Sequence, residues 1–342
     1  MRCALCAAPS SNFPALLRYS GSLPLAEKAL IARIRRQATS PSRVPTEIGD
    51  DCAVLRLPRD HEVLITTDLS LEGVHFRRDW HPAESVGHRC LARGLSDIAA
   101  MGGQPVAAFL SLALPRSVPQ NWVDEFVQGL LALARNFGVS LDGGDTAQSL
   151  HGILADIVVL GSVPKGTAVL RSGARPGDRV YVSGALGGSA AALERLLREP
   201  KRKLNPDQFP AQFFPQPRIA LGRLLRQRGW ASAMIDLSDG LSTDIGHLCD
   251  ESEVGAELQE EAIPLAAIGR SREKVSLSAA LHGGEDYELL FTASPDQRLP
   301  SRIAGIPITQ IGRITRAKKV MLLARQHSRR ALKPQGWQHL AQ

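Results

Sequence analysis

The sequence predicts a mixed α/β protein with two domains, each built around a β-sheet. At 342 residues, the chain is long enough that two domains are a better expectation than one. Apolar stretches of strand length alternate with segments whose apolar residues recur at helical spacing. The composition shifts at Pro164-Lys165-Gly166. We therefore expect an extension at residues 1–22, which we predict to be disordered, and domains at residues 23–164 and 165–342.

The first half contains the clearest local signals. Apolar side chains recur at helical spacing in three segments, which predicts helices at residues 25–36, 82–101 and 122–137. Pro82 opens the second helix, and Gly102-Gly103 closes it. Strands are expected at residues 52–57, 63–67, 106–114, 139–141 and 153–163. The nearly continuous apolar run 106–114 further predicts a strand that is buried on both faces.

The second half repeats the α/β alternation. We expect strands at residues 179–183, 234–237, 289–292 and 308–311. Helices are expected at residues 189–198 and 219–227, with a third starting near residue 241. Residues 200–217 are rich in proline and separate two of these helices.

Composition excludes several classes of protein. No apolar run reaches the roughly 18 residues of a membrane span, so we expect no membrane partner. The net charge is +7, but aromatic residues make up only 5% of the chain, which leaves little material for stacking on bases. Five scattered cysteines do not form a disulfide framework, and Cys3 and Cys6 have no second C-x-x-C pair. Reduced thiols and a cytoplasmic location are expected.

Acidic residues recur beside Gly, Ser or Thr near the predicted strand ends. A carboxylate beside a small residue is placed to reach a cation while the backbone approaches a phosphate, and oxygen ligands of this kind suit Mg²⁺. The chain is therefore interpreted as a Mg²⁺–nucleotide enzyme. The candidate metal ligands of this set are Asp50, Asp51, Asp68, Asp97, Asp145, Asp236 and Asp239.

The argument for a metal depends on the whole set. A single Asp beside Gly or Ser is more often part of a turn or a helix cap. Two carboxylates about 4 Å apart, at an effective dielectric near 20, repel each other by about 4 kcal/mol. If several of these side chains converge at one edge of a sheet, cations are needed to hold them together.

Phosphate-binding signatures are mostly absent. Gly161 and Gly166 have the spacing of a P-loop, but the lysine precedes the second glycine instead of following it. Gly143-Gly144-Asp145-Thr146 is expected to form a turn after a strand, which either lets a phosphate approach the backbone or is a plain turn. The roles of two further side chains are undecided: His75 and Trp337 are either structural or bind a ligand. Arg171 is either a surface cation or a group that neutralises charge beside a triphosphate.

Seven motifs, in this order, resemble those of the thiamine-monophosphate kinases, a family of the aminoimidazole-ribonucleotide-synthetase-like superfamily. The resemblance runs from about residue 25 to 337, and the combined set separates this family from its superfamily relatives. The motifs are IGDDCAVL (48–55), TTDLSLEGVHF (66–76), LSDIAAMGG (95–103), GGDT (143–146), RSGARPGD (171–178), IDLSDGLSTDIGH (235–247) and GGEDYELLF (283–291).

The resemblance implies a homodimer whose N-terminal α/β domains join across the dimer, each followed by a C-terminal α/β domain. It also implies direct transfer of the γ-phosphoryl group of ATP to thiamine monophosphate, with several Mg²⁺ ions. We hypothesise that Asp68, Asp97 and Asp145 are catalytic, because they hold the metals that bridge donor and acceptor. The metal positions that it carries over are Asp51, Thr66, Thr67, Asp68, Asp97, Asp145, Asp236 and Asp239. Nucleotide contacts fall on Gly144, Asp145, Arg171 and Ser238, and contacts to thiamine monophosphate on His75, Glu285 and Trp337.

Some features depart from the family pattern or leave alternatives. Gly94 stands where Asn is common in the family, and we expect it to loosen the packing behind Asp97. A superfamily relative that acts on a purine intermediate or on selenide is one rival. A basic nucleic-acid-binding protein is the other, although the sparse aromatic residues argue against it, and we expect no nucleic-acid partner.

Overall fold

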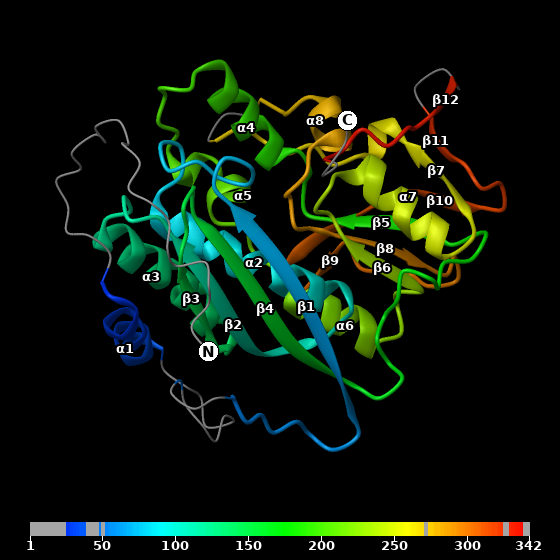
Figure 1. Ribbon diagram of the computed structural model, residues 1–342. Coiled ribbons are helices and arrows are strands. Elements are labelled where there is room, and N and C mark those ends of the chain that lie inside the picture. Colours follow the sequence, from blue (N-terminus) through cyan, green and yellow to red (C-terminus); the bar gives the residue numbers. More distant parts are fainter. Residues whose placement is uncertain (1–24, 39–47, 49–51, 270–272, 324–327, 338–342) are drawn as a thin grey trace.

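Helix α2 (Ala83–Ala100) lies between two β-sheets and contacts both of them. On one side it packs against β1, β2 and β4 of the first sheet, and on the other it reaches β6 of the second (Figure 1). This computed structural model describes residues 25–38, 48, 52–269, 273–323 and 328–337. Its mixed α/β architecture confirms the predicted fold class.

The first sheet has four strands in the order β1-β4-β2-β3. Strands β2 and β3 run parallel, whereas β4 is antiparallel to both of its neighbours. The strands are β1 (His61–Leu71), β2 (Gln104–Leu114), β3 (Ser140–Gln148) and β4 (Leu154–Pro164). Helix α3 (Gln120–Phe137) packs beside α2 on one face, and α1 (Glu27–Gln37) lies at the β3 edge.

The second sheet has the strand order β12-β11-β7-β10-β5-β8-β6, with β9 paired to β10. Its strands are β5 (Arg179–Ser183), β6 (Ala233–Asp236), β7 (Gly255–Gln259), β8 (Leu289–Ala293), β9 (Arg302–Ile303), β10 (Ile306–Thr315), β11 (Val320–Leu323) and β12 (Arg329–Ala331). The helices of this half are α4 (Gly188–Arg198), α5 (Pro210–Phe213), α6 (Ile219–Gln227), α7 (Leu241–Glu251) and α8 (Leu277–His282), with 3-10 turns at Pro206–Gln208 and Glu260–Ala262.

The amphipathic helices form as their patterns predict. In α3, Trp122, Phe126, Leu130 and Leu133 are all buried, and the helix ends at Gly138, whose φ of 64° is left-handed. One continuous apolar core runs from this helix through α2 to the second sheet. The packing of α2 therefore fixes the position of one sheet relative to the other.

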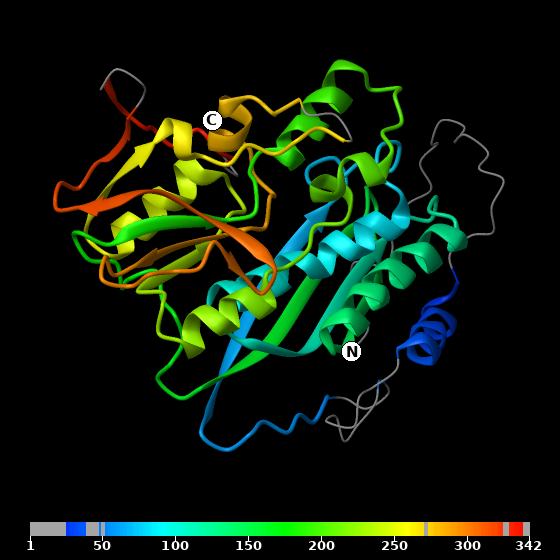
Figure 2. The same ribbon diagram turned by 180° about the vertical axis from the view of Figure 1, so that it is seen from behind.

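Among the residues that the structure describes, no helix covers one face of the first sheet. In Figure 1 this face looks toward the reader, and in Figure 2, from behind, α2 and α3 lie in front of the opposite face. On β1, Val63, Ile65 and Leu69 point to the uncovered face and are 44%, 69% and 48% exposed. We call this surface the open face. The open face explains why the prediction for β2 is wrong. This strand is predicted to be buried on both faces, but its residues alternate between buried and half-buried.

Three other predictions about local structure are wrong. Residues 52–57 form no strand. The strand predicted at residues 63–67 is longer: β1 continues past Asp68 to Leu71, because its pairing with β4 runs on to Leu154. The segment 143–146 is not a turn but part of β3, paired in parallel with β2 next to an irregularity in register. A glycine is required there, because a Cβ on Gly144 would lie 1.8 Å from the carbonyl oxygen of Leu110.

Candidate functional site

Three carboxylates from distant parts of the sequence meet between the two sheets. Asp68 lies on β1, Asp97 on the last turns of α2 and Asp236 at the end of β6. The Oγ1 atom of Thr66 donates a hydrogen bond to Asp97, and the Oγ atom of Ser96 donates one of 2.7 Å to Asp236. We call Asp68, Asp97 and Asp236 the acidic cluster. Its formation is what the recurrence of Asp beside small residues predicts.

Burial and mutual repulsion dominate the electrostatics of this cluster. Burial, and then the charge of Asp97, raise the pKa of Asp68 to about 7, against the opposing effect of Arg93. The same two causes raise the pKa of Asp236 to about 7, and burial raises that of Asp97. Without a cation, the cluster therefore holds protons at a pH where an ordinary aspartate is ionised.

The donor set of the cluster fits a divalent cation. The Oδ2 atom of Asp68 is buried and has no hydrogen-bond partner, which is costly for a carboxylate oxygen unless a ligand completes it. Every group that faces it in this cluster offers oxygen, the ligand that Mg²⁺ prefers. A cation bound here would relieve both the repulsion and the missing contact.

The acidic surface extends into the second half through the turn before α7. Ligand atoms of Asp239, Asp244 and His247 lie within 4.8 Å of one another. Asp244 is buried, and its Oδ2 accepts hydrogen bonds from the backbone N–H groups of Asp239 and Gly240. After burial, the charge of Asp236 is the largest cause of the raised pKa of Asp244. Sequence reasoning missed Asp244, although it stands in the same motif as Asp239.

Asp145 lies apart from the acidic cluster within one chain. One row of paired residues crosses the first sheet through Leu69, Asp156, Ser111 and Asp145. At about 4.8 Å between neighbouring strands, the three steps separate Asp145 from β1 by roughly 14 Å. Leu69 is exposed on the open face, and Asp145, in the same row, therefore points to that face too. Asp68 precedes Leu69 on β1, so its side chain points to the opposite face, toward α2. Asp145 and Asp68 therefore do not share one coordination shell in this chain.

The open face carries a second acidic group. Thr67 on β1 donates a 2.8 Å hydrogen bond to Asp156 on β4, and Asp145 accepts one of 2.8 Å from the backbone N–H of Thr146. The predicted pair Thr66 and Thr67 is thus divided, with Thr66 on the side of the acidic cluster and Thr67 on the open face. Neighbouring residues of a strand necessarily point to opposite faces.

Two arginines of α2 hold Glu285, which sequence reasoning did not anticipate. Arg89 donates to Oε2 of Glu285 at 2.6 Å, and Arg93 donates to Oε1 at 2.5 Å. The same arginines contact the backbone carbonyls of His75 and Leu69. Burial would raise the pKa of Glu285, but the two guanidinium groups outweigh it and lower this pKa to about 2. Glu285 is therefore ionised, and its arginine clamp joins the second half to β1.

The remaining predicted residues surround the acidic cluster or lie beyond it. Arg171 is exposed, and its charge lowers the pKa of both Asp97 and Asp236. The carbonyl of Ser238 accepts a hydrogen bond from the backbone N–H of Glu285. Trp337 is 54% exposed, and its backbone N–H donates to the carbonyl of Asp239. Asp50, Asp51, Cys3 and Cys6 lie outside the described residues.

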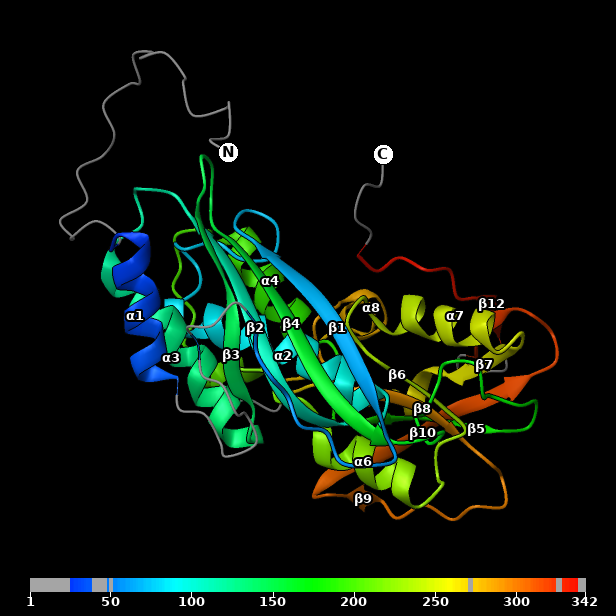
Figure 3. The ribbon, with the colours of Figure 1, turned by 60° about the horizontal axis from the view of Figure 1, so that its bottom comes forward.

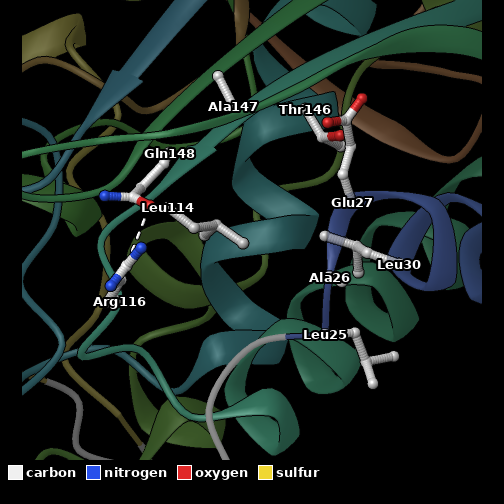
Figure 4. Close-up of a pocket in the computed structure, with 9 residues that line it drawn as sticks. All are labelled: Leu25, Ala26, Glu27, Leu30, Leu114, Arg116, Thr146, Ala147 and Gln148. Carbon is white, nitrogen blue, oxygen red and sulfur yellow. Dashed lines mark hydrogen bonds between the residues drawn. The ribbon is translucent and has the colours of Figure 1, made fainter. Parts of the chain in front are cut away.

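A cavity of about 400 Å³ adjoins the segment that carries Asp145 (Figure 4). It lies between the start of α1 and the ends of β2 and β3, with Glu27 and Thr146 among its lining residues. The lining is mostly apolar, and its size lies in the range of small-molecule pockets. The apolar residues are Leu25, Ala26, Leu30, Leu114 and Ala147, and the polar edge is formed by Arg116 and Gln148.

Two family models match the chain in tandem. Residues 49–194 match the AIR synthase related protein, N-terminal domain, and residues 175–323 match the AIR synthase related protein, C-terminal domain. Together they span most of the chain and both sheets. The chain is thus an AIR synthase related protein.

Curated relatives give the particular family. The chain is 38% identical over 326 residues to the thiamine-monophosphate kinase of Escherichia coli K12, covering 92% of this chain and 98% of that one. It is 32% identical over 323 residues to the thiamine-monophosphate kinase of Bacillus subtilis 168, covering 91% and 98%. The chain belongs to the thiamine-monophosphate kinase family.

Solved structures agree with this assignment. A thiamine-monophosphate kinase from Stenotrophomonas maltophilia superposes with a TM-score of 0.76 at 36% identity, covering 87% of this chain and 96% of that one. The structure described as AaThiL complexed with AMPPCP and TMP gives 0.73 at 32% identity, covering 83% and 89%. A hydrogenase maturation protein HypE gives 0.72 at 18% identity, covering 90% and 98%, and so shares the fold alone.

We searched the helices of the described residues for a membrane span. None of their helices combines the length and the apolar character needed to span a bilayer.

Proposed function

We propose that this protein transfers the γ-phosphoryl group of ATP directly to thiamine monophosphate and thereby forms thiamine diphosphate. The observation that carries the proposal is the acidic cluster, with its buried and unpartnered Asp68 oxygen, in a chain of this family. The relatives are named for this activity, and the AaThiL complex is described as holding AMPPCP and TMP.

Several Mg²⁺ ions are part of the proposal. Asp68, Asp97 and Asp236 would hold cations on the α2 side of the sheet, and Thr66 and Asp239 would add ligands there. Asp51, which lies outside the described residues, is a further proposed ligand. Thr67 and Asp145 would hold cations on the open face. Bound Mg²⁺ supplies charge neutralisation for the phosphoryl oxygens, which is the main requirement of phosphoryl transfer.

The nucleotide would enter beside β3. We propose Gly144 and Asp145 as its contacts on this strand; their neighbour Thr146 lines the apolar cavity, whose size and lining suit a purine ring. Gly144 is exposed, so its backbone is accessible to a phosphate. Ser238 is the nucleotide contact on the side of the second half, and Arg171 would stabilise negative charge near Asp97.

Thiamine monophosphate would bind beside Glu285, His75 and Trp337. Glu285 is ionised, and His75 is close enough that its charge contributes to the lowered pKa of Glu285. An ionised carboxylate and an exposed indole ring both suit the cationic thiazolium ring of this acceptor. The attacking phosphate oxygen of the acceptor is already largely deprotonated at neutral pH, so transfer requires alignment more than a general base.

A homodimer through the open face belongs to the same proposal. The exposed Val63, Ile65 and Leu69 are flanked on β4 and β2 by the half-buried Val158, Leu160 and Phe109. Contiguous apolar surface of this kind marks an interaction site. Two open faces packed together would also bring the Asp145 side of each sheet into an enclosed setting.

We propose a cytoplasmic location, with which the free buried thiols of Cys90 and Cys249 are compatible.

Substrate choice tests the proposal against its rivals. We expect ADP release with ATP, Mg²⁺ and thiamine monophosphate, and only background release with thiamine or with aminoimidazole-pathway substrates. Turnover on a purine intermediate or on selenide, without turnover on thiamine monophosphate, would assign the chain to a superfamily relative. Salt-dependent binding of DNA or RNA without any kinase activity would favour the nucleic-acid alternative.

The direct transfer has its own test. ATP that is made chiral at the γ-phosphorus reports the number of displacements, because each in-line step inverts the configuration. We expect inversion in the product, which corresponds to one transfer. Retention would indicate an intermediate phosphoenzyme and would contradict the direct mechanism.

A further inference from the structure

A second cavity, of about 710 Å³, lies between the first sheet and helix α6. It is lined by the starts of β1 and β2, the end of β4, the segment before β1 and the last turns of α6. Figure 3 shows α6 beside these strand ends. His61, in its lining, precedes Asp68 by seven positions on the same strand, which is roughly 23 Å at about 3.3 Å per residue. The His61 end of the cavity is therefore well separated from Asp68.

The lining of this cavity is positively charged and contains no carboxylate. Arg56, Arg223, Arg226 and His61 are its titratable residues, and Gln104, Ser162 and Gln227 are its other polar side chains. The ion pairs between described residues all involve other arginines or Lys318. Arg223 and Arg226 are half-buried and Arg56 is exposed, and no carboxylate among the lining residues balances these three guanidinium groups.

Neutral acceptors hold two of these guanidinium groups in place. Arg226 donates from Nε to the carbonyl of Gly102 at 2.8 Å and from Nη1 to Thr167 at 3.1 Å. Arg223 donates from Nη1 to the side chain of Gln104 at 2.5 Å. Each guanidinium has five N–H donors, so these contacts orient the groups while leaving donors for a ligand. A site with oriented donors loses less conformational entropy when it binds.

The arrangement is unfavourable without an anion. Arg223 and Arg226 stand one turn apart on α6, where like charges repel each other. Burial, and then the charge of Arg223, lower the pKa of Arg226. The position of Arg226 in the last turn of α6 complements the helix dipole and explains one positive charge. It does not explain why Arg56, from a different segment, lines the same cavity.

We propose that this cavity is a binding site for a small anion with two or more negative charges, of the phosphate or polyphosphate class. The planar fork of arginine matches phosphate oxygens, and several arginines around one concave site are typical of phosphate recognition. The cavity is a half-open hollow lined by both halves of the chain, and its volume suits a small molecule rather than an extended surface. Because α6 packs closely on α2 through Gly222 and Ala99, a bound anion would tie the two halves together.

Calorimetric titration of the full-length protein with inorganic pyrophosphate, in excess EDTA, tests this site. Removing divalent cations leaves the acidic cluster repulsive to anions, so binding then reports the basic cavity. We expect measurable binding that R223Q/R226Q weakens by at least about tenfold. R228Q is the matched control, because Arg228 is exposed at the end of the same helix and does not line the cavity. No binding by the unaltered protein, or equal binding by the double variant, would overturn the proposal.

Two further measurements keep the result interpretable. If R223Q/R226Q does not fold, R56Q replaces it, because Arg56 is exposed and lies outside the helices and strands, and we expect weakening of at least about threefold. Titrations with inorganic phosphate and ADP separate the two sources of the anion. Similar affinity for pyrophosphate and ADP indicates recognition of the phosphate groups alone, whereas tighter ADP binding indicates a nucleotide. Since no turnover is measured, failure here would leave the proposed kinase activity untouched.

Discussion

Arg89 on α2 donates a 2.6 Å hydrogen bond to Glu285, a residue 196 positions further along the chain. Arg93, one turn later on the same helix, donates to the other carboxylate oxygen. The side chains of the two arginines are only 5% and 10% exposed, and that of Glu285 is 25% exposed. The clamp therefore fixes the segment before β8 against the first sheet, at the place where we propose that thiamine monophosphate binds.

Removing the charge of Glu285 should destabilise the protein strongly. E285Q leaves two buried guanidinium groups without their partner, and we expect a loss of roughly 3 kcal/mol in the free energy of unfolding. Denaturant titration measures this loss. E253Q is the control, because Glu253 pairs with Lys318 at the surface and should change stability by less than about 1 kcal/mol. Equal effects of the two substitutions would show that the clamp contributes little.

Gly94 tightens the packing behind Asp97, which contradicts the expectation that it loosens it. A Cβ at this position would lie 2.6 Å from Cγ2 of the fully buried Val159 on β4. We expect G94A to cost about 1–3 kcal/mol by overpacking. In the double variant with V159A, the loss should be smaller than the sum of the two single losses, because the second change provides the missing space. Additive losses in denaturant titrations would contradict this contact.

A charge on the open face should prevent dimer formation. Ile65 is 69% exposed in the single chain, and an aspartate there would have to be desolvated in a paired sheet. We expect I65D to be a monomer by light scattering after size-exclusion chromatography, under conditions where the unaltered protein is a dimer. L150D is the control, because Leu150 is 83% exposed between β3 and β4 and lies outside both strands. A dimeric I65D would place the interface elsewhere.

Substitution of the proposed metal ligands should abolish turnover. D68N and D145N keep the shape of each side chain but remove one ligand charge, and we expect at least about a hundredfold loss of kcat with ATP, Mg²⁺ and thiamine monophosphate. D60N, in an exposed turn before β1, should retain normal turnover. Near-normal turnover of both D68N and D145N would reject the assignment. If only D68N lost turnover, the catalytic metal ligands would be confined to the α2 side of the sheet.

The sequence predicted best those helices whose apolar periodicity and end signals lie within the segment itself. The helices α2, α3 and α6 have strong apolar periodicity and clear boundaries, and their predicted bounds agree closely with the observed ones. Strand β11 and strand β12 are short and basic at their flanks, and only their pairing with distant strands makes them strands. The open face misled the prediction for β2, because an apolar face that no helix covers has the same composition as a buried one.

The site was predicted in part for the same reason. Small residues beside Asp68, Asp97 and Asp236 marked them correctly as members of one cluster. No local pattern records that Arg89 and Arg93 face Glu285, since the three residues meet only through the packing of α2 against the second half. The distance of Asp145 from Asp68 likewise depends on strand order, which the sequence does not state.

The pH dependence of stability should reveal the cluster when metal is removed. The pKa values of Asp68 and Asp236 are raised to about 7 in the folded protein, against about 4 in the unfolded chain. Between these values the folded state binds more protons than the unfolded state, so stability falls as pH rises from about 4 to 7. Thermal unfolding in EDTA across this range checks the sign. A rise in stability through the same window would contradict the raised pKa values.

The central claim is that Asp68, Asp97 and Asp236 are held together by divalent cations, and the Mg²⁺ dependence of thermal unfolding at pH 8 tests it most directly. For the unaltered protein, saturating Mg²⁺ should raise the unfolding midpoint by roughly 3 °C relative to EDTA. D97N should unfold at the same or a higher temperature than the unaltered protein in EDTA, because one repulsive charge is gone, and should lose most of its response to Mg²⁺. An unaltered protein that does not respond to Mg²⁺, or a D97N variant that responds equally, would contradict the account.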